Sequence, residues 1–236
     1  MYRRIVTRVI RSAALIYRTI TCAMKQVLHG INTILSPPYC IDCQCLLTDY
    51  SVLCINCIHT LPKPAPHPIR ITDAKSSTVY AYTLYQHPLE QLVRAKFTGN
   101  HTGTTQLAYL LAQYVKSLPL DVDYIAPIPL HWYRRFWRGF NQADVLAHAV
   151  ATVLRKPVVH ALKRVKNTAF QSTLVVAERK KNLHAAFICT VSVKNKRILL
   201  IDDLYTTGAT ATAAARELYA QGAASVELLV ACKVIT

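Results

Sequence analysis

Apolar residues recur along the chain at two spacings, and the two spacings alternate after residue 70. Short, nearly continuous apolar runs predict buried strands at 77–85, 122–130, 157–165, 185–190, 197–203 and 225–233. Apolar residues at intervals of three and four predict helices at 88–97, 104–118, 141–155 and 208–222. Strands and helices in alternation require right-handed crossovers, so we predict an α/β fold with a mostly parallel sheet and helices on both of its faces.

The first 36 residues follow a different pattern and predict a basic amphipathic extension, 1–36. Apolar residues such as Ile5, Val9 and Ile16 stand at helical spacing, with arginines between them and no acid in the segment. Such a helix can lie on a membrane surface through residues 1–34, pack on its own domain, or precede the true start of the protein. No run reaches the roughly 18 apolar residues that span a bilayer, and the segment does not fit a secretory signal. We therefore expect a cytoplasmic protein, with the inner face of the membrane as a second location.

Residues 37–70 change in composition to cysteine and proline, which predicts a small zinc-binding module and a Pro-rich linker. Two Cys-x2-Cys pairs, Cys40 with Cys43 and Cys54 with Cys57, can present four thiolates to one tetrahedral ion, and zinc suits such a structural site. Buried free thiols or disulfides are the alternatives for these four residues. Possible substitute ligands stand nearby at Cys45, His59 and His67. Four thiolates already close a structural site, so packing or surface roles are favoured for the substitutes.

An acidic pair ends the predicted strand at 197–203, in a chain that has only 12 acidic residues. Ligands gather at the carboxyl ends of parallel strands, so this strand delivers Asp202 and Asp203 to the edge where a ligand binds. The next residues, "TTGAT", supply hydroxyl groups and a turn glycine at the start of a helix, whose N–H groups and dipole favour a phosphate. This combination predicts a pocket for a ribose 5-phosphate. An exposed Asp-Asp turn before an N-capped helix is the alternative.

The stretch 198–210, "ILLIDDLYTTGAT", closely resembles the phosphoribosyl-pyrophosphate signature of the type I phosphoribosyltransferases. The apolar run, the paired acids and the TTG loop all occur in the same order. The resemblance implies that Asp202 and Asp203 hold the 2- and 3-hydroxyls of the ribose. It implies that the 5-phosphate is wrapped by Thr206, Thr207, Gly208, Ala209 and Thr210. It also implies that Mg²⁺ accompanies phosphoribosyl pyrophosphate.

Two more stretches, 126–147 and 166–187, resemble the ComF competence-protein family, in which a four-cysteine zinc module precedes a phosphoribosyltransferase domain. The resemblance covers about residues 35–236 and implies a phosphoribosyltransferase domain at 71–236.

Further ligand contacts are expected from two loops of that domain. The first corresponds by position to the pyrophosphate loop of the family and offers Arg138, Gly139 and Asn141, because a pyrophosphate needs several donors. The second lies where type I enzymes carry a mobile cover over the active site, and its candidates are Arg164, Gln171, Arg179 and Asn182. Catalytic roles are assigned to Asp202, Asp203, Arg164 and Arg179. Each of these arginines can instead be solvated surface.

The charge of the chain bears on its partner. Twenty-eight Lys and Arg against 12 Asp and Glu give +16, a bias expected of proteins that meet phosphates, nucleic acid or anionic membrane. Between 131 and 181, 11 Lys and Arg are interleaved with aromatic residues, a mixture able to pair with phosphates and stack bases. Core packing is the alternative for the aromatic residues.

The predicted function is therefore that of a ComF-type competence protein with a domain that binds phosphoribosyl pyrophosphate. The family resemblance implies DNA uptake in naturally transformable bacteria, with incoming single-stranded DNA and DNA-uptake or DNA-processing proteins as partners. An active phosphoribosyltransferase is the alternative, acting on an unidentified acceptor in nucleotide metabolism or salvage. In that reaction a nitrogen nucleophile displaces pyrophosphate from C1 of the ribose. Regulation through ligand-gated partner binding is a third reading.

Overall fold

The computed structural model describes residues 39–47, 51–94, 101–130, 140–165 and 186–235. The chain divides into two compact units, Met1–Cys57 and Ile58–Thr236, which are described separately. The predicted basic extension, 1–36, lies outside the described residues. The predicted domain boundaries after residues 36 and 70 stay a prediction.

In the first unit, the described backbone closes a tight turn around the first cysteine pair. Tyr39 and Leu46 form an antiparallel bridge, and the Cys40 N–H donates to the Cys45 carbonyl at 2.9 Å. Gln44 adopts a left-handed conformation with φ of 61°, which lets the chain reverse within the turn. The second cysteine pair lies at the start of helix α2 (Ile55–Thr60).

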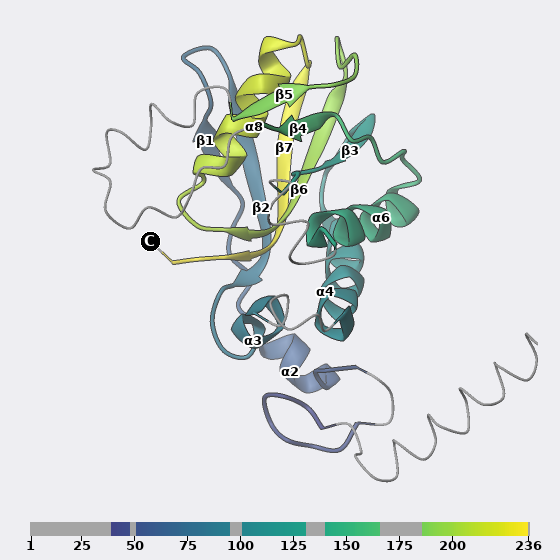
Figure 1. The fold of residues 1–236 in the computed structure, drawn as a ribbon. Helices are drawn as coiled ribbons and strands as arrows, with labels where there is room; N and C mark the ends of the chain where they lie inside the picture. The colour runs from purple at the N-terminus through teal and green to yellow at the C-terminus, as the bar shows by residue number, and fades with distance from the viewer. Residues whose placement is uncertain (1–38, 48–50, 95–100, 131–139, 166–185, 236) are drawn as a thin grey trace, which may run out of the picture. The chain divides into compact units, whose positions relative to one another are not determined.

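The second unit is built on one five-stranded sheet (Figure 1). Its strands are β1 (His67–Arg70), β2 (Ser76–Leu84), β3 (Tyr124–Pro127), β6 (Arg197–Tyr205) and β7 (Ser225–Lys233). Their order is β1-β2-β7-β6-β3, and only β1 pairs antiparallel with its neighbour. The predicted mostly parallel sheet is confirmed.

Helices cover both faces of this sheet, as the alternation of strands and helices predicts. They are α3 (Leu89–Arg94), α4 (His101–Tyr114), the 3-10 turn η2 (Val115–Ser117), α6 (Gln142–Leu154) and α8 (Ala209–Ala220). Alanines of α8 pack on one face in a buried cluster with Ile198 and Leu200 of β6. Helices α4 and α6 pack against each other and cover the other face (Figure 1). In the described part of the chain no helix has the length and apolar character needed to cross a membrane.

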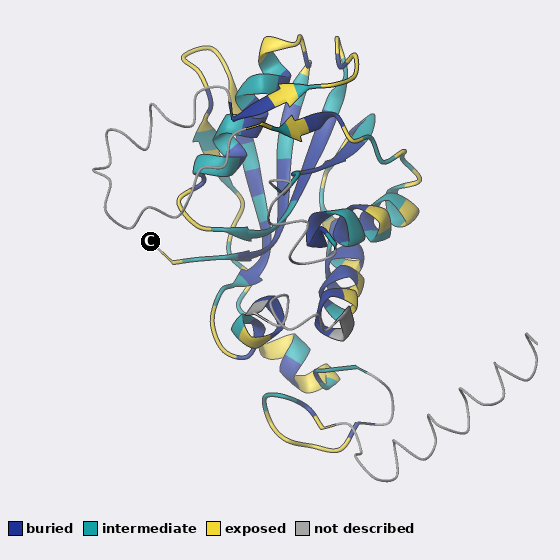
Figure 2. Cartoon of the chain, in the orientation of Figure 1, coloured by how far each residue is buried: buried dark blue, intermediate teal, exposed yellow. Residues whose placement is uncertain are grey.

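The centre of the core lies in β6 and β7, whose side chains are buried on both faces (Figure 2). Residues 198–201 of β6 are at most 1% exposed, which explains the continuous apolar run in the sequence. Full burial ends at Asp202, where β6 leaves the core toward the carboxyl ends of the strands. The strand therefore presents the acidic pair where its apolar run stops.

Two predicted strands form a second, smaller sheet instead of extending the main one. Strands β4 (Leu162–Arg164) and β5 (Phe187–Cys189) pair antiparallel with each other. Of the predicted strand 157–165, only a single bridge from Val158 to Ile125 extends the main sheet beyond β3. The small sheet joins the core on the α8 face, through Leu162 and Phe187.

Candidate functional site

The carboxyl ends of β3 and β6 form the natural ligand-binding position of this sheet. The two strands are neighbours, yet β3 leads into α6 on one face and β6 leads into α8 on the other. Connections that leave adjacent strands toward opposite faces open a crevice between them, and ligands of open α/β sheets bind in such crevices. The acidic pair therefore lies where this topology places a ligand.

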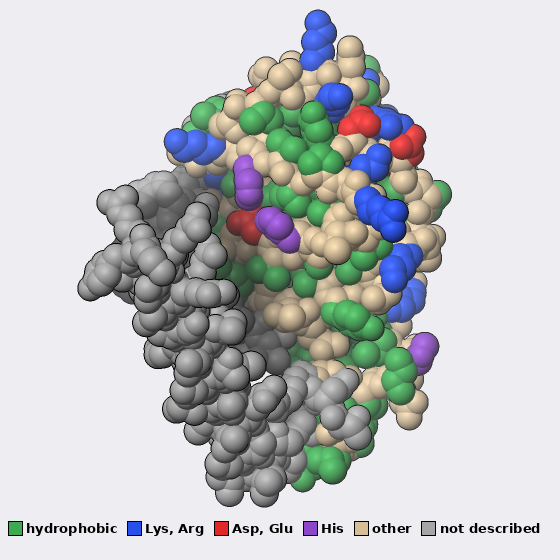
Figure 3. Space-filling view, turned by 90° about the vertical axis from the view of Figure 1, so that its right-hand side faces the viewer, with side chains coloured by type: hydrophobic (Ala, Val, Ile, Leu, Met, Phe, Trp, Pro, Cys, Tyr) green, Lys and Arg blue, Asp and Glu red, His purple; other side chains and the backbone are tan. Residues whose placement is uncertain are grey.

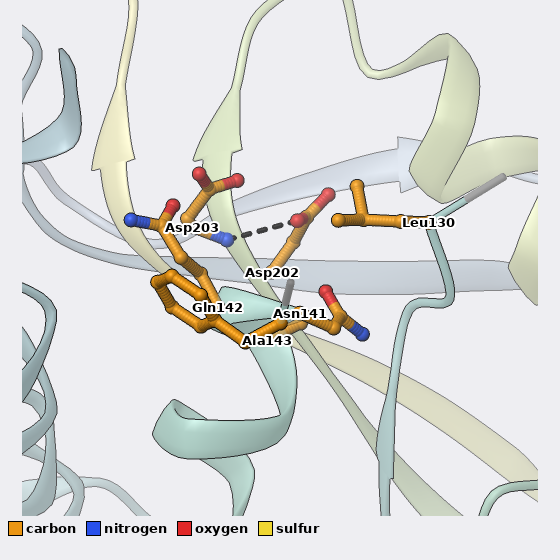
Figure 4. A pocket seen from close by; sticks show the side chains of 7 residues that line it. Leu130, Asn141, Gln142, Ala143, Asp202 and Asp203 are labelled. Carbon is orange, nitrogen blue, oxygen red and sulfur yellow. Dashed lines mark hydrogen bonds between the residues drawn. The ribbon is translucent and has the colours of Figure 1, made fainter. Parts of the chain in front are cut away.

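A pocket occupies this crevice (Figure 4). Its lining consists of Leu130, Phe140, Asn141, Gln142, Ala143, Asp202 and Asp203. Within it, Oδ1 of Asp202 accepts a hydrogen bond from the backbone N–H of Asp203 at 2.9 Å. This contact orients the Asp202 carboxylate against its own strand end. The structure thus brings three predicted site residues together, namely Asn141, Asp202 and Asp203.

The first residues of α6 are fixed by side-chain hydrogen bonds to other elements. Asn141, the N-cap residue, is 7% exposed and donates from Nδ2 to the Ile128 carbonyl at 3.2 Å. Gln142 is 5% exposed and donates from Nε2 to Oγ1 of Thr104 in α4 at 2.9 Å. These bonds hold the α6 N-terminus at the pocket, where its backbone N–H groups can meet an anion.

The loop between β6 and α8 has the conformation that the TTG pattern favours. Gly208 is the N-cap of α8 and adopts a left-handed conformation with φ of 73°. Thr206 and Thr207 are exposed, and Ala209 and Thr210 form the first turn of the helix. The first N–H groups of a helix have no partner within it, so this loop can bind the phosphate of a ligand.

Tyr205 lies directly against this loop, a contact that the sequence reasoning missed. A Cβ atom on Gly208 would approach Tyr205 Oη to 2.2 Å. The Tyr205 ring also meets the His67 ring edge-on at 5.7 Å, and Lys233 Nζ lies 3.4 Å from each ring nitrogen of His67. Burial, and after it the charge of Lys233, lowers the pKa of His67, and burial raises the pKa of Tyr205.

The remaining predicted contacts are not in the pocket lining or are not described. Arg164 ends β4, and its guanidinium lies 5.6 Å from the centre of the Phe187 ring, outside the set of residues that line the pocket. Five predicted residues lie outside the described part of the chain, namely Arg138, Gly139, Gln171, Arg179 and Asn182. Their assignment stays a prediction.

In the first unit, the four predicted cysteine ligands form one cluster. The sulfur atoms of Cys40, Cys43, Cys54 and Cys57 all lie within 4.8 Å of one another, a geometry compatible with a structural metal ion. Sγ of Cys43 and Sγ of Cys54 are 3.6 Å apart, and the Cys54 N–H donates to Cys40 Sγ at 3.4 Å. Burial alone raises the pKa of Cys40, but hydrogen bonds from backbone N–H groups of the module outweigh burial and lower it to about 6.

The possible substitute ligands are not among the four residues of this cluster. Cys45 is exposed, and its thiol contacts those of Cys43 and Cys54, but it is not one of the four residues whose sulfur atoms converge. His59 is exposed on α2, and the His67 ring contacts Tyr205 and Lys233. The preference for four thiolates over these groups therefore agrees with the structure.

Comparison with known proteins gives close relatives, although no protein-family profile matches the chain. This chain is 33% identical over 204 residues to the DNA utilization protein YhgH of Salmonella typhimurium, and the match covers 83% of this chain and 84% of the relative. It is 33% identical over 184 residues to competence protein F of Haemophilus influenzae, covering 73% and 75%. The chain belongs to the ComF family. Competence protein ComFC of Bacillus subtilis is a further ComF relative, 35% identical over 150 residues, with 61% of this chain and 58% of the relative covered.

Solved structures similar to this ComF chain include two phosphoribosyl-handling enzymes. Glutamine phosphoribosylpyrophosphate amidotransferase of B. subtilis matches 72% of this chain and 36% of its own, with 15% identity and a TM-score of 0.42. Adenine phosphoribosyltransferase of Leishmania tarentolae matches 71% and 94%, with 13% identity and a TM-score of 0.40. The topology of the ComF chain itself shows the α/β fold, with a mostly parallel sheet between two helical layers, and its first unit contains the four-cysteine cluster.

Proposed function

We propose that this ComF protein binds phosphoribosyl pyrophosphate, or a related sugar phosphate, in the pocket between β3 and β6 and serves DNA uptake by handling incoming single-stranded DNA. The observation that supports this ligand is the set of residues that line the pocket. Asp202 and Asp203 line a pocket at the switch point of the sheet together with the first residues of α6, and the left-handed loop that starts α8 follows them. The names of its relatives, competence protein F and DNA utilization protein YhgH, support the biological role.

The chemistry of the pocket suits this ligand. Carboxylates accept hydrogen bonds from vicinal hydroxyls, and such charge-assisted bonds are stronger than neutral ones. The N–H groups at the start of α8 suit the 5-phosphate, and those at the start of α6 suit a pyrophosphate. Mg²⁺ prefers oxygen ligands, so the carboxylates of Asp202 and Asp203 would hold it together with oxygens of the bound sugar phosphate. When bound, Mg²⁺ supplies neutralisation of the pyrophosphate charge.

Zinc is the metal we assign to the four-cysteine cluster. Four thiolates saturate one tetrahedral ion and leave no open position, which makes the site structural and not catalytic. A cluster of this kind couples metal binding to folding of the module that carries it.

The same pocket supports a second function, active phosphoribosyl transfer. Two helix N-termini beside an acidic pair are the arrangement needed to hold both ends of phosphoribosyl pyrophosphate, which is the donor in such reactions. Pyrophosphate release in the presence of candidate nitrogen acceptors, dependent on Asp202 and Asp203, is the result that this function predicts. Absence of release with every acceptor tried leaves binding as the activity of the pocket.

Calorimetry with phosphoribosyl pyrophosphate and Mg²⁺ tests the proposed ligand. Asp202→Asn with Asp203→Asn should weaken binding by about 1–3 kcal/mol for each charged hydrogen bond lost. A charge-matched control is Asp73→Asn with Asp121→Asn, since both residues are exposed and lie outside the pocket lining. The control should bind as the wild type does. The ligand assignment fails if the wild type does not bind, or if the folded Asp202 and Asp203 double variant binds equally well.

The proposal also includes contact with a membrane surface through residues 1–34 and with DNA-uptake or DNA-processing proteins. A basic amphipathic helix binds anionic lipid through apolar burial and charge together. Deleting residues 1–34 should abolish co-sedimentation with anionic vesicles and leave sugar-phosphate binding intact. Equal vesicle binding by the full-length and shortened proteins would reject this part of the proposal.

A further inference from the structure

Gln142 is a polar pocket residue to which the proposed function gives no role. Its side chain is 5% exposed, and its Oε1 atom has no hydrogen-bond partner among the described residues. Buried polar atoms in folded proteins are nearly always paired, because an unpaired one keeps the cost of leaving water. Gln142 is one of the residues that line the pocket, so a ligand bound there is a candidate partner for this buried, unpaired oxygen.

The other end of the same amide is fixed. Nε2 donates to Oγ1 of Thr104 at 2.9 Å, and Thr104 is itself only 2% exposed in α4. In Figure 4 the oxygen of the Gln142 amide lies on the side that faces Asp203, and the amide nitrogen lies on the opposite side. The carboxamide is thus held through its nitrogen by a buried bond to α4, and its oxygen lies on the side of Asp203.

We propose that Gln142 Oε1 accepts a hydrogen bond from a hydroxyl of the bound sugar, and that Thr104 holds the amide in the orientation that permits this. The pocket then presents acceptors from three side chains, Asp202, Asp203 and Gln142. The vicinal diol of a ribose brings two O–H donors on neighbouring atoms, so one of these donors is shared between Gln142 Oε1 and a carboxylate of the acidic pair. The inference rests on the proposed sugar-phosphate function and adds a residue that selects for the diol.

The orientation of the amide is the point that an experiment must decide. The Thr104 hydroxyl can donate as well as accept, so it would also hold a reversed amide that presents Nε2 to the pocket. A reversed amide would donate to a ligand oxygen, whereas the proposed orientation accepts from a hydroxyl. Gln142→Glu separates the two, because a carboxylate of the same length can only accept.

The test compares two ligands on three proteins in buffer without Mg²⁺. Ribose 5-phosphate can engage both the hydroxyl acceptors and the phosphate loop, whereas inorganic phosphate can engage the loop alone. The ratio of their affinities cancels effects of changed charge on the phosphate. We expect Gln142→Met to lower the preference for ribose 5-phosphate about tenfold with phosphate binding unchanged, and Gln142→Glu to retain the preference within about threefold.

Each outcome decides the inference. An unchanged preference in Gln142→Met overturns it, and an equal loss in Gln142→Glu overturns the acceptor role. If Gln142→Met does not fold, Thr104→Val decides, since an unchanged preference there shows that the amide does not depend on Thr104 as proposed. A wild type that binds phosphate but shows no preference for ribose 5-phosphate contradicts the proposed function itself. If the wild type prefers ribose 5-phosphate and Gln142→Met keeps that preference, only the role of Gln142 is contradicted and the proposed function stands.

Discussion

Gly208 stands at a backbone position that excludes a side chain for two separate reasons. Its φ of 73° is left-handed, and an added Cβ would lie 2.2 Å from Tyr205 Oη. We expect Gly208→Ala to lose more stability than the roughly 1–2 kcal/mol of left-handed strain, because the Tyr205 ring must also move. It should also weaken phosphate binding, since the N–H groups of the loop shift with the backbone. Urea unfolding and a phosphate titration measure the two effects.

Gly222 offers a matched control for this substitution. Its φ of 86° is also left-handed, but the nearest atom to an added Cβ is Lys194 Cγ at 3.5 Å, an ordinary contact. Gly222→Ala should therefore cost only the strain of about 1–2 kcal/mol and leave phosphate binding unchanged. Equal losses in the two alanine variants would show that the contact with Tyr205 has no effect.

At the scale of single residues, the sequence predicts positions that depend on local order along the chain. Asp202 and Asp203 follow a buried strand, and Gly208 follows at a fixed distance, so their places at the edge of the sheet could be inferred. Gln142 could not be inferred in the same way. Its position depends on Thr104, which is 38 residues away in another helix, and no local spacing encodes that contact.

The start of β6 is tied to the segment before β3 by ion pairs of Arg197. Arg197 Nη2 lies 2.8 Å from Asp123 Oδ1, and the Arg197 backbone N–H donates to Asp123 Oδ2 at 2.9 Å. Asp121 also pairs with the same guanidinium. Hydrogen bonds from the Arg197 side chain, and then from its backbone, hold the pKa of Asp123 well below its usual range.

The ion pair between Asp123 and Arg197 makes the stability of the fold depend on pH. The pKa of Asp123 is lower in the folded chain than in the unfolded chain, where it is about 3.9. The Asp123 carboxylate therefore stabilises the fold above about pH 3.9, and this stabilisation is lost as the pH falls below that value. We expect Asp123→Asn to lower the urea midpoint at pH 7. Between about pH 4 and pH 2, the variant should lose less additional stability than the wild type. Parallel pH curves for wild type and variant, with Asp73→Asn as the control, would contradict this.

At the scale of elements, the apolar pattern predicts which segments are strands better than it predicts their partners. The run at 157–165 is apolar enough for a strand, but its pairing is divided between Ile125 and β5. Strand β1 lies in a segment rich in proline, which reads as a linker. Its exposed Pro68 is tolerated because β1 is the edge strand, where a missing N–H costs no ladder bond.

At the scale of the whole molecule, the zinc assignment predicts a stoichiometry. Protein purified under reducing conditions should carry about one zinc ion per chain, because four thiolates saturate one tetrahedral ion. Cys54→Ser should release the metal and lower the unfolding temperature, since binding of structural zinc is coupled to folding. Cys45→Ser is the control and should retain the metal, because Cys45 contacts the cluster but is not one of its four ligands. Elemental analysis that finds no zinc in the wild type would reject the assignment.

The net charge of +16 predicts how the protein should bind single-stranded DNA. Lys and Arg side chains gather along one margin of the face seen in Figure 3, where they can meet a phosphate backbone. Binding through such a surface falls steeply with salt, because it releases counterions. Acidic side chains lie among the Lys and Arg in the upper part of this margin. Loss of the two pocket carboxylates removes no Lys or Arg, so DNA binding and sugar-phosphate binding should respond differently to it.

The double variant Asp202→Asn with Asp203→Asn separates the two activities. It should lose sugar-phosphate binding, because the acceptors for the ribose hydroxyls are weakened. It should keep or gain affinity for single-stranded DNA, because removal of two negative charges lowers repulsion of the backbone. Fluorescence anisotropy with a labelled oligonucleotide at several salt concentrations measures this, and Asp73→Asn with Asp121→Asn controls for net charge. A parallel loss of DNA and sugar-phosphate binding in the folded variant would show that both ligands use the pocket, and would contradict DNA binding at a separate cationic surface.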